Sequence, residues 1–308
     1  MTGRFAPSPT GELHLGNLRT AVVAWLSARA GGRPFLVRME DLDRVQARPE
    51  HAAAQLRDMA ALGLDWDGDV VKQSERFHLY DEAIDRLAAA GSVYECFCSR
   101  REIRNDIEAA SSAPHGPPGS YPGTCRDLSI GERAERRASG RPPALRLRTD
   151  HGIYDFVDRL VGPQSGGADD FVLRRNDGVP AYNLAVVVDD GLQGVTDVVR
   201  GDDLLPSTPR HVMLQQMLEI DTPSYLHIPL VLGGDGERLA KSHGATTLAE
   251  LRKAGVSTAT VRSWIGSSLG LVAPGEAVAF SNLVDRFDPT TLPKKVVEVP
   301  DFVLRPKP

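Results

Sequence analysis

The chain has 308 residues, a formal net charge of −5, and ordinary fractions of apolar (41%) and charged (25%) residues. No apolar run is long enough to span a membrane, and three cysteines, an odd number, argue against a disulfide framework. The composition therefore predicts a globular protein without a membrane partner, large enough for one domain with an insertion or for two. Reduced cysteines, and a first motif at residue 4 that leaves no room for a signal peptide, predict a cytoplasmic location.

The first motif joins a predicted strand over residues 3–6 to a predicted helix over 16–30. Pro7, Pro9 and Gly11 force a turn between them, because proline fixes φ and lacks a backbone donor. His14 and Gly16 then lie at the N-terminus of the helix, where unpaired N–H groups suit a phosphate. Taken alone, His-x-Gly also fits a helix-capping loop with an incidental histidine.

A second buried strand is predicted over residues 35–39. Strand, helix and strand in succession form a βαβ unit, which implies a parallel sheet. Ligands of such sheets bind beyond the carboxyl ends of the strands. Glu40, which follows the second strand, could therefore hold an ammonium group near the His14 loop. The alternative role for Glu40 is a turn or helix-capping carboxylate.

After predicted helices over 50–62 and 76–90, the composition changes, and residues 92–175 are interpreted as an insertion. It contains a charged helix over 100–110, a segment over 111–120 rich in proline and glycine, and a strand over 144–148. Between Cys96 and Arg148, ten arginines stand against six acidic residues, a local charge of +4. Such an insertion could meet a phosphate backbone, or its arginines could form a solvated helix face.

The insertion also holds all three cysteines of the chain, Cys96, Cys98 and Cys125. As thiolates they could bind a zinc ion, which needs a fourth ligand. Three nearby side chains are candidates for that ligand, and histidine is the commoner type: Tyr121, His115 and Asp127. The alternative is three reduced, partly buried cysteines without a metal.

In the second half, a strand is predicted over 169–174, and the apolar run over 180–190 fits a helix or a buried strand. A short strand over 198–199 ends at Arg200, whose guanidinium could grip a carboxylate with two parallel hydrogen bonds. Tyr182 could add a hydroxyl. The alternatives are a surface salt bridge for Arg200 and a core position for Tyr182. A helix over 207–218 and a buried strand over 226–232 follow.

The strand over 226–232 leads to a glycine-flanked loop that contains Lys241, and two more helices are predicted over 246–254 and 257–268. A single lysine in such a loop is usually a surface residue. The sequence Arg238-Leu-Ala-Lys-Ser around it nevertheless resembles the KMSKS loop of class I aminoacyl-tRNA synthetases. Arg238 keeps a lysine's charge, whereas Ala240 replaces a serine and loses a hydroxyl.

The run from Arg4 to Asn17 resembles the HIGH signature of the same family, with Asn17 in place of the second histidine. Its flanks, Arg-Phe-Ala-Pro-Ser-Pro-Thr-Gly and Asn-Leu-Arg-Thr-Ala, are similar to the glutamyl-specific branch. The Cys-x-Cys and Tyr-x-x-x-Cys spacings are similar to the zinc knuckle of a short form of that branch. Only about sixty residues follow Lys241, so we expect no anticodon-binding domain.

This resemblance implies an α/β fold: a Rossmann-like parallel-sheet catalytic domain with a zinc-containing insertion and a short helical C-terminal region. The implied boundaries follow the motifs. They are 1–91 for the first half of the nucleotide-binding domain, 92–175 for the insertion with its zinc knuckle and acceptor-binding-like subdomain, 176–244 for the second half with the KMSKS-like loop, and 245–308 for the helical region.

The resemblance further implies that a monomer uses ATP with Mg²⁺ to activate L-glutamate as glutamyl-adenylate. Glutamate would then pass to the queuosine base in the anticodon of tRNA(Asp). The implied site residues are His14 and Lys241 for catalysis; Arg4, Phe5, Ala6, Pro7, Ser8, Glu40, Tyr182 and Arg200 for glutamate; His14, Gly16, Asn17 and Lys241 for ATP; and Cys96, Cys98, Tyr121 and Cys125 for structural zinc.

Three alternative functions stay open at this point. A truncated glutamyl-tRNA synthetase would charge tRNA(Glu), and another nucleotidyltransferase with a His-x-Gly loop would activate a different acid. A non-catalytic, RNA-binding paralogue would activate nothing. His14 and Lys241 argue against that last alternative, and Ala240 argues mildly for it.

Overall fold

The computed structural model describes residues 2–109, 121–233, 235–237, 239 and 246–299. Its body is a seven-stranded sheet in the order β3-β2-β1-β9-β10-β6-β7. Neighbouring strands are parallel except in the hairpin of β6 and β7. In that order the strands are Val71–Lys72, Phe35–Met39, Gly3–Phe5, Asp197–Gly201, Ser224–Ile228, Ile153–Asp158 and Gly162–Gly167.

The strand order reverses at β1, which lies between β2 and β9. At such a switch point the connections leave the sheet toward opposite faces, so a crevice opens at the carboxyl ends of the two strands. The predicted βαβ unit of β1, α1 and β2 is confirmed, and the parallel sheet confirms the predicted fold class. Phe5 and Met39 end these strands, so the loops that follow them face the crevice.

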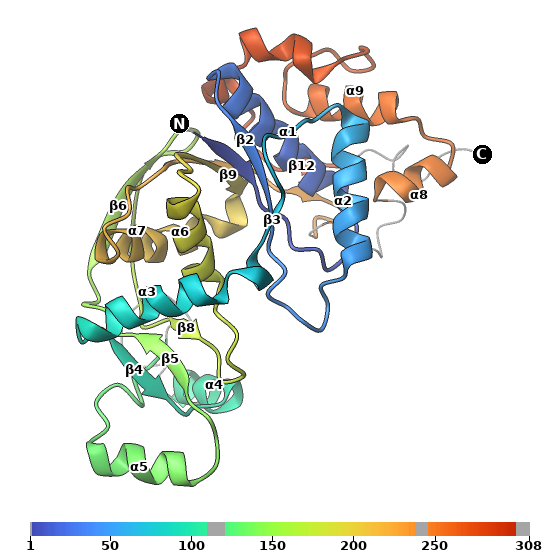
Figure 1. Cartoon of the computed structure of the whole chain (residues 1–308). Helices are drawn as coiled ribbons and strands as arrows, with labels where there is room; N and C mark the ends of the chain where they lie inside the picture. The colour runs from blue at the N-terminus through green and yellow to red at the C-terminus, as the bar shows by residue number, and fades with distance from the viewer. Residues whose placement is uncertain (1, 110–120, 234, 238, 240–245, 300–308) are drawn as a thin grey trace.

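The helices of the body cover both faces of this sheet (Figure 1). The predicted helices are confirmed to within a few residues, and the ambiguous apolar run over 180–190 is a helix, α6. The bounds are Leu15–Ala30 for α1, Pro49–Leu62 for α2, Phe77–Ala89 for α3, Tyr182–Leu192 for α6, Thr208–Met217 for α7, Leu248–Lys253 for α8 and Thr258–Ser268 for α9.

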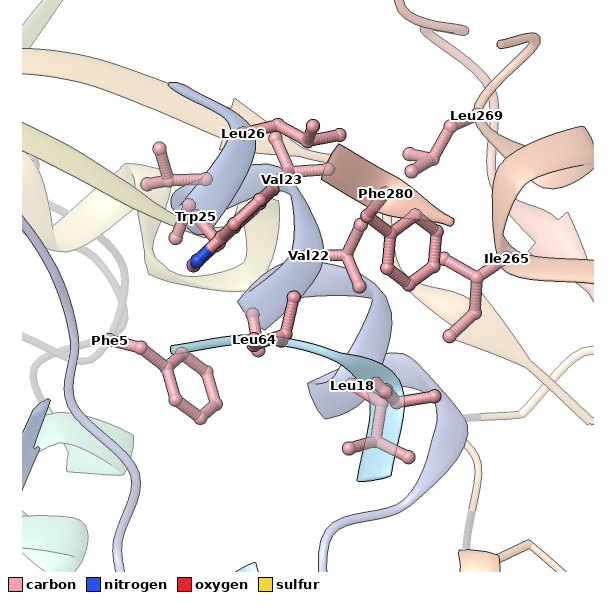
Figure 2. Packing of buried hydrophobic residues seen from close by; sticks show 14 of the residues in the cluster. Phe5, Leu18, Val22, Val23, Trp25, Leu26, Leu64, Ile265, Leu269 and Phe280 are labelled. Carbon is pink, nitrogen blue, oxygen red and sulfur yellow. The ribbon is translucent and has the colours of Figure 1, made fainter. Parts of the chain in front are cut away.

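The C-terminal region packs against α1, which is the central helix of the larger hydrophobic cluster. Figure 2 shows Val22 of α1 beside Phe280, with Ile265 of α9 beyond the ring. Because α1 is buried on nearly all sides, its sequence is apolar almost all round. On the other face of the sheet, α3, α6 and α7 form a second cluster around residues such as Val187 and Leu214.

The strand predicted over 226–232 is wrong in one respect, because it is two strands. β10 ends at Ile228, and β11 is the separate strand Val231–Leu232. Pro229 lies between them and cannot donate a backbone hydrogen bond to a sheet. β11 instead pairs with β12, Val297–Glu298, far along the chain.

A smaller lobe lies at one end of the molecule, below α3 in Figure 1. Its antiparallel sheet has the order β4-β5-β8, formed by Val93–Cys96, Ala144–Leu147 and Val172–Arg174. The helices α4, Arg100–Ala109, and α5, Ile130–Ala138, belong to it. The β6–β7 hairpin lies within the predicted insertion 92–175 but joins the large sheet, and sequence reasoning assigned no element there. Among the described helices, none has the length and apolar character needed to span a bilayer.

Candidate active site

A cavity of about 660 Å³ opens at the carboxyl ends of β1, β2 and β9. Its walls come from the turn after β1, the first residues of α1, the start of α6 and the segment around Leu230. The structure brings together, in this one cavity, every described residue that the sequence assigned to glutamate or ATP: Arg4, Phe5, Ala6, Pro7, Ser8, His14, Gly16, Asn17, Glu40, Tyr182 and Arg200.

His14 is the N-cap of α1 and forms a capping box with Asn17. Nδ1 of His14 accepts a hydrogen bond from the backbone N–H of Asn17 at 3.3 Å, and Asn17 Oδ1 accepts one from the backbone N–H of His14 at 3.3 Å. A backbone N–H can only donate, so Nδ1 carries no proton and the neutral ring keeps its proton on Nε2. Burial lowers the pKa of His14 and favours this neutral form. The remaining ring N–H is therefore a donor suited to a phosphoryl oxygen.

Position 16 requires glycine, because the imidazole of His14 leaves no room for a side chain there. A Cβ atom on Gly16 would lie 3.0 Å from both Cε1 and Nδ1 of His14. Any larger residue would therefore displace the ring or the start of α1. The glycine of the His-x-Gly motif thus allows the histidine to cap the helix closely.

The end of the chain that follows the KMSKS-like loop returns to the His14 loop. Thr247 pairs with His14 in an isolated β-bridge, and the N–H of Leu15 donates to the carbonyl of Thr246 at 3.0 Å. Leu239 is buried and lines the cavity. Lys241 itself, with Arg238 and Ala240, lies outside the described residues. The nearest described residues on both sides of Lys241 therefore lie at this site.

Arg4 projects from β1 and is 4% exposed. Its Nε and Nη2 donate to the two carboxylate oxygens of Asp190 at 3.2 and 3.3 Å. Arg38 also donates to Asp190, at 2.8 Å. Burial raises the pKa of Asp190, but the positive charges of Arg4 and Arg38 outweigh this effect and leave the pKa lowered. Arg4 is therefore held rigidly, and its charge is offset.

Sequence reasoning missed Arg38, Asp189 and Asp190. Asp189 accepts hydrogen bonds from Gln73, Arg76 and Tyr80, all at 2.7 or 2.8 Å. The available signal was the presence of charged residues inside the apolar runs Phe-Leu-Val-Arg-Met and Ala-Val-Val-Val-Asp-Asp. A charge that a helix or strand buries needs a partner elsewhere in the chain.

Glu40 lies where β2 ends, with its Oε1 3.5 Å from Nη2 of Arg38. Burial raises the pKa of Glu40 to about 7, although Arg38 and Arg4 pull it down. The side chain therefore changes its charge near neutral pH in the absence of a ligand. A bound ammonium group would replace the lost solvation of the carboxylate and favour its ionised form.

Arg200 is the penultimate residue of β9 and is 5% exposed. Nε donates to His227 Nε2 at 2.9 Å, Nη1 lies 3.1 Å from His211 Nδ1, and Nη2 donates to Thr208 Oγ1 at 2.9 Å. The carbonyl of Leu204 is a fourth acceptor, at 3.5 Å. Every acceptor that the described residues offer to this guanidinium is thus uncharged.

Residues 1–288 match the family model of the class I tRNA synthetases (E and Q), catalytic domain. The chain belongs to this family. The phosphate-suited helix terminus and the charged strand ends described above are therefore parts of a class I synthetase catalytic domain.

Three similar proteins place this synthetase within the family. A curated glutamyl-Q tRNA(Asp) synthetase of Nocardia farcinica is 58% identical over 295 residues, which are 95% of this chain and 91% of that protein. A glutamate–tRNA ligase of Nitratidesulfovibrio vulgaris is 41% identical over 286 residues, which are 92% of this chain but 60% of that protein. The crystal structure of a glutamate tRNA ligase from Elizabethkingia meningosepticum superposes with a TM-score of 0.83 at 26% identity, covering 99% of this chain and 68% of that one.

A second cavity of about 950 Å³ lies between the catalytic domain of this synthetase and the smaller lobe. Ser8, Thr10, Glu40 and Tyr182 line both cavities. On the lobe side, the second cavity is lined by four arginines: Arg100, Arg141, Arg146 and Arg175. Arg141 pairs with Glu102 and Arg175 pairs with Asp177, so the lobe places four arginines, two of them in ion pairs, next to the end of the first cavity that holds Glu40 and Tyr182.

The three cysteines of the synthetase meet at the base of the lobe. Their Sγ atoms all lie within 4.8 Å of one another, so the cluster could hold a metal ion. The phenol oxygen of Tyr121 lies 3.4 Å from Cys96 Sγ and 3.6 Å from Cys98 Sγ. Of the other candidate ligands, Asp127 is exposed and pairs with Arg148, and His115 lies outside the described residues.

Proposed function

We propose that this chain uses ATP to activate L-glutamate and transfers the glutamate to the queuosine base in the anticodon of tRNA(Asp). The observation that carries the proposal is the combination of groups in one cavity. A helix N-terminus with His14 suits a triphosphate, while Arg4, Arg200 and Glu40 suit the two carboxylates and the ammonium of glutamate.

Sequence identity supports the queuosine branch over a glutamate–tRNA ligase, because the chain is 58% identical to the Nocardia protein and 41% identical to the Nitratidesulfovibrio protein. We therefore expect this chain to share the activity of the more similar enzyme.

The first step needs no side-chain nucleophile. An α-carboxylate oxygen of glutamate attacks the α-phosphorus of ATP in line, and the bond to the pyrophosphate oxygen breaks with its electron pair. His14 Nε2–H and Lys241 would bind phosphoryl oxygens as negative charge develops, and Mg²⁺ carried by ATP would neutralise the pyrophosphate. Gly16 and Asn17 hold the start of α1 in position for ATP.

The same cavity would orient glutamate. Glu40 would accept hydrogen bonds from the ammonium, and Tyr182 would donate its hydroxyl to a carboxylate oxygen. Phe5, Ala6, Pro7 and Ser8 form the wall against which the amino acid lies. In the second step, a nucleophilic group of the queuosine base attacks the acyl carbon and AMP leaves. Most of the catalysis in both steps is positioning and charge stabilisation.

The second cavity supports an approach of the RNA from the lobe. It adjoins the expected position of glutamate through Ser8, Glu40 and Tyr182. Its four arginines would bind phosphates that flank the modified base, because phosphate contacts position a nucleic acid without reading its sequence.

We propose that the protein is a cytoplasmic monomer. The cytoplasmic location is proposed because the three cysteines are free thiols that fit a reducing compartment.

The cysteine cluster is proposed to hold one structural zinc ion through Cys96, Cys98, Tyr121 and Cys125. A tetrahedral zinc site has edges of about 3.8 Å between sulfurs and about 3.5 Å between sulfur and oxygen. The distance from Cys98 Sγ to Cys125 Sγ is 3.4 Å, and the two sulfur–phenol distances are 3.4 and 3.6 Å. Four protein ligands leave no open position, so the ion would support the lobe and take no part in chemistry.

Pyrophosphate exchange without RNA tests the first half of the proposal. Glutamate should support exchange, and a panel of other amino acids should not. Labelled glutamate should then attach to tRNA(Asp) that carries queuosine and not to tRNA(Asp) that lacks it. Label at the 3′ end of tRNA(Glu) would instead establish a truncated ligase, and exchange with a different acid would establish another specificity. A complete absence of exchange would favour a non-catalytic RNA-binding protein.

A further inference from the structure

The two arginines that line the catalytic cavity differ in how their charge is balanced. Arg4 makes a two-point ion pair with Asp190, so its positive charge is offset inside the protein. Arg200 is equally buried, but its described acceptors are two imidazole nitrogens, a hydroxyl and a carbonyl. A buried cation without an anionic partner is energetically costly unless a ligand provides one.

His227 is fixed in a neutral form by the groups on its two sides. Nδ1 lies 2.7 Å from Asp158 Oδ2, which can only accept, so Nδ1 carries the ring proton. Nε2 therefore has a free lone pair and accepts from Arg200 Nε. Asp158 is itself held by the backbone N–H groups of Leu160 and Val161, and the ring of His227 separates it from the guanidinium.

His211 is fixed in the opposite tautomer. The guanidinium of Arg200 can only donate, so His211 Nδ1 is the acceptor and the proton is on Nε2. That proton is donated to Asn183 Oδ1 at 2.9 Å. Burial lowers the pKa of His211 well below its usual value, and the charge of Arg200 lowers it further. Burial also lowers the pKa of His227, although Asp158 raises it.

We propose that His211, His227 and Thr208 form a charge-free clamp, which orients Arg200 and leaves its positive charge for the side-chain carboxylate of the amino acid. The proposal rests on the proposed activation of glutamate and adds the reason for its specificity. A side-chain carboxylate completes the ion pair of Arg200, whereas the amide of glutamine would leave the buried charge unbalanced. Arg4 differs from Arg200, because its guanidinium already pairs with the carboxylate of Asp190, which Arg38 shares. The three clamp residues are positioning residues, since they act through Arg200.

Two variants of His211 test the clamp. The replacement residues, Glu and Gln, differ in charge but hardly in size, so the pair isolates the effect of a negative charge beside Arg200. His211→Glu would place a carboxylate beside Arg200 and should raise the KM for glutamate by about 100-fold or more, the scale seen for close charge pairs. His211→Gln keeps a neutral acceptor and should raise that KM by less than about tenfold. The KM for ATP should stay within about twofold of the wild-type value in both variants, because only the amino-acid pocket changes.

The preference for glutamate over glutamine is the second measurement, taken as the ratio of kcat/KM in pyrophosphate exchange. The ratio of kcat/KM for glutamate to kcat/KM for glutamine should stay close to the wild-type value in His211→Gln. It should fall strongly in His211→Glu. Glutamate binding without ATP, measured by calorimetry, should follow the same order. Equal KM values and equal preferences in the two variants would overturn the clamp.

A second matched pair keeps the test decisive if a variant at His211 does not fold. Thr208→Asp and Thr208→Asn change the opposite side of the guanidinium, at the first residue of α7, where an aspartate is compatible with the helix. The aspartate variant should raise the KM for glutamate by about 100-fold or more, and the asparagine variant should raise it by less than about tenfold. If the wild-type chain activates no glutamate at all, the proposed function fails. If the wild-type chain activates glutamate but the two variants of each pair have equal KM values for glutamate, the clamp is wrong and the proposed function stands.

Discussion

The catalytic cavity lies at the carboxyl ends of the strands of a seven-stranded sheet whose two faces are covered by large hydrophobic clusters. The cysteine cluster instead belongs to a lobe with a sheet of only three short strands. In the described part of the lobe, the buried apolar core at the cysteines is small and includes the sulfur-bearing residues themselves: Tyr94, Cys96, Phe97, Tyr121 and Cys125. The cavity therefore keeps its shape without a ligand. The lobe depends for its packing on the same atoms that would bind a metal.

This difference predicts that changes in the two regions are separable. A change in the cavity should alter chemistry and leave the fold intact, whereas a change at the cysteines should alter the structure of the lobe and the RNA-dependent step.

Lys241→Ala gives the largest expected effect. It should lower adenylate formation by roughly a hundredfold or more, the scale for losing a preorganised electrostatic contact.

Pyrophosphate exchange measures this loss, and thermal unfolding provides the control. The unfolding midpoint of Lys241→Ala should equal that of the wild-type chain. Near-normal exchange in this variant would remove the lysine from the mechanism. It would also weaken the similarity to the KMSKS loop as an argument for the site.

Cys125→Ser tests the other region. Removal of one thiolate should lower metal affinity by about 10–100-fold or more, the range already reached when an outer partner of a ligand is removed. Transfer of glutamate to tRNA should fall with the metal content, while exchange without RNA should stay within about threefold of the wild-type rate. Asp127→Asn is the matched control, because this exposed carboxylate pairs with Arg148 and should not affect the metal. An equal loss of both half-reactions in Cys125→Ser would show that the two regions are coupled.

The raised pKa of Glu40 predicts a pH dependence that belongs to the cavity alone. Below a pKa of about 7 the carboxyl group is protonated and cannot pair with the ammonium of glutamate. The KM for glutamate should therefore fall by about tenfold between pH 6 and pH 8, as a single proton is released on binding. Exchange rates measured over that range at saturating ATP would show it. A flat profile in the wild-type chain would contradict the prediction, and Glu40→Gln should have no such slope.

Asn17→Ala should give the smallest effect. It removes the acceptor for the His14 N–H in the capping box, which should lower the free energy of unfolding by about 1 kcal/mol. Chemical denaturation would measure this loss. Asn17→Asp keeps an acceptor at the same place and should restore most of the stability. The KM for ATP should rise only a few-fold in Asn17→Ala, because the backbone N–H of residue 17 still donates to Nδ1 and fixes the tautomer of His14.

Much of the fold and the cavity could be predicted from the sequence because the signals are local. Helical spacing identified α1, α2 and α3, and the rule that ligands bind at strand ends brought Glu40 and Arg200 to the same edge as His14. The cavity lining fits that expectation. These predictions required only each segment's own pattern and the parallel order of the sheet.

What the sequence could not predict depends on distant partners. Asp190 meets Arg38 across 152 positions of the chain, and His227 meets Asp158 across 69. The β6–β7 hairpin was missed because β7 is Gly-Pro-Gln-Ser-Gly-Gly, with low strand propensity, and Ile153 and Val157 of β6 are exposed. Among the candidate fourth ligands, spacing alone could not favour Tyr121, because all three side chains are near enough to the cysteines in the sequence.

The pairing of Arg4 with Asp190 across 186 positions has a consequence for biosynthesis. As the polypeptide leaves the ribosome, β1 can pair with β2 at once, but its other neighbour, β9, is made only after Asp197 has been translated. Until then one edge of the first strand is open, and Arg4 lacks its ion pair with Asp190 for nearly as long. We therefore expect the nascent chain to be vulnerable to aggregation and to depend on chaperones until most of it has emerged.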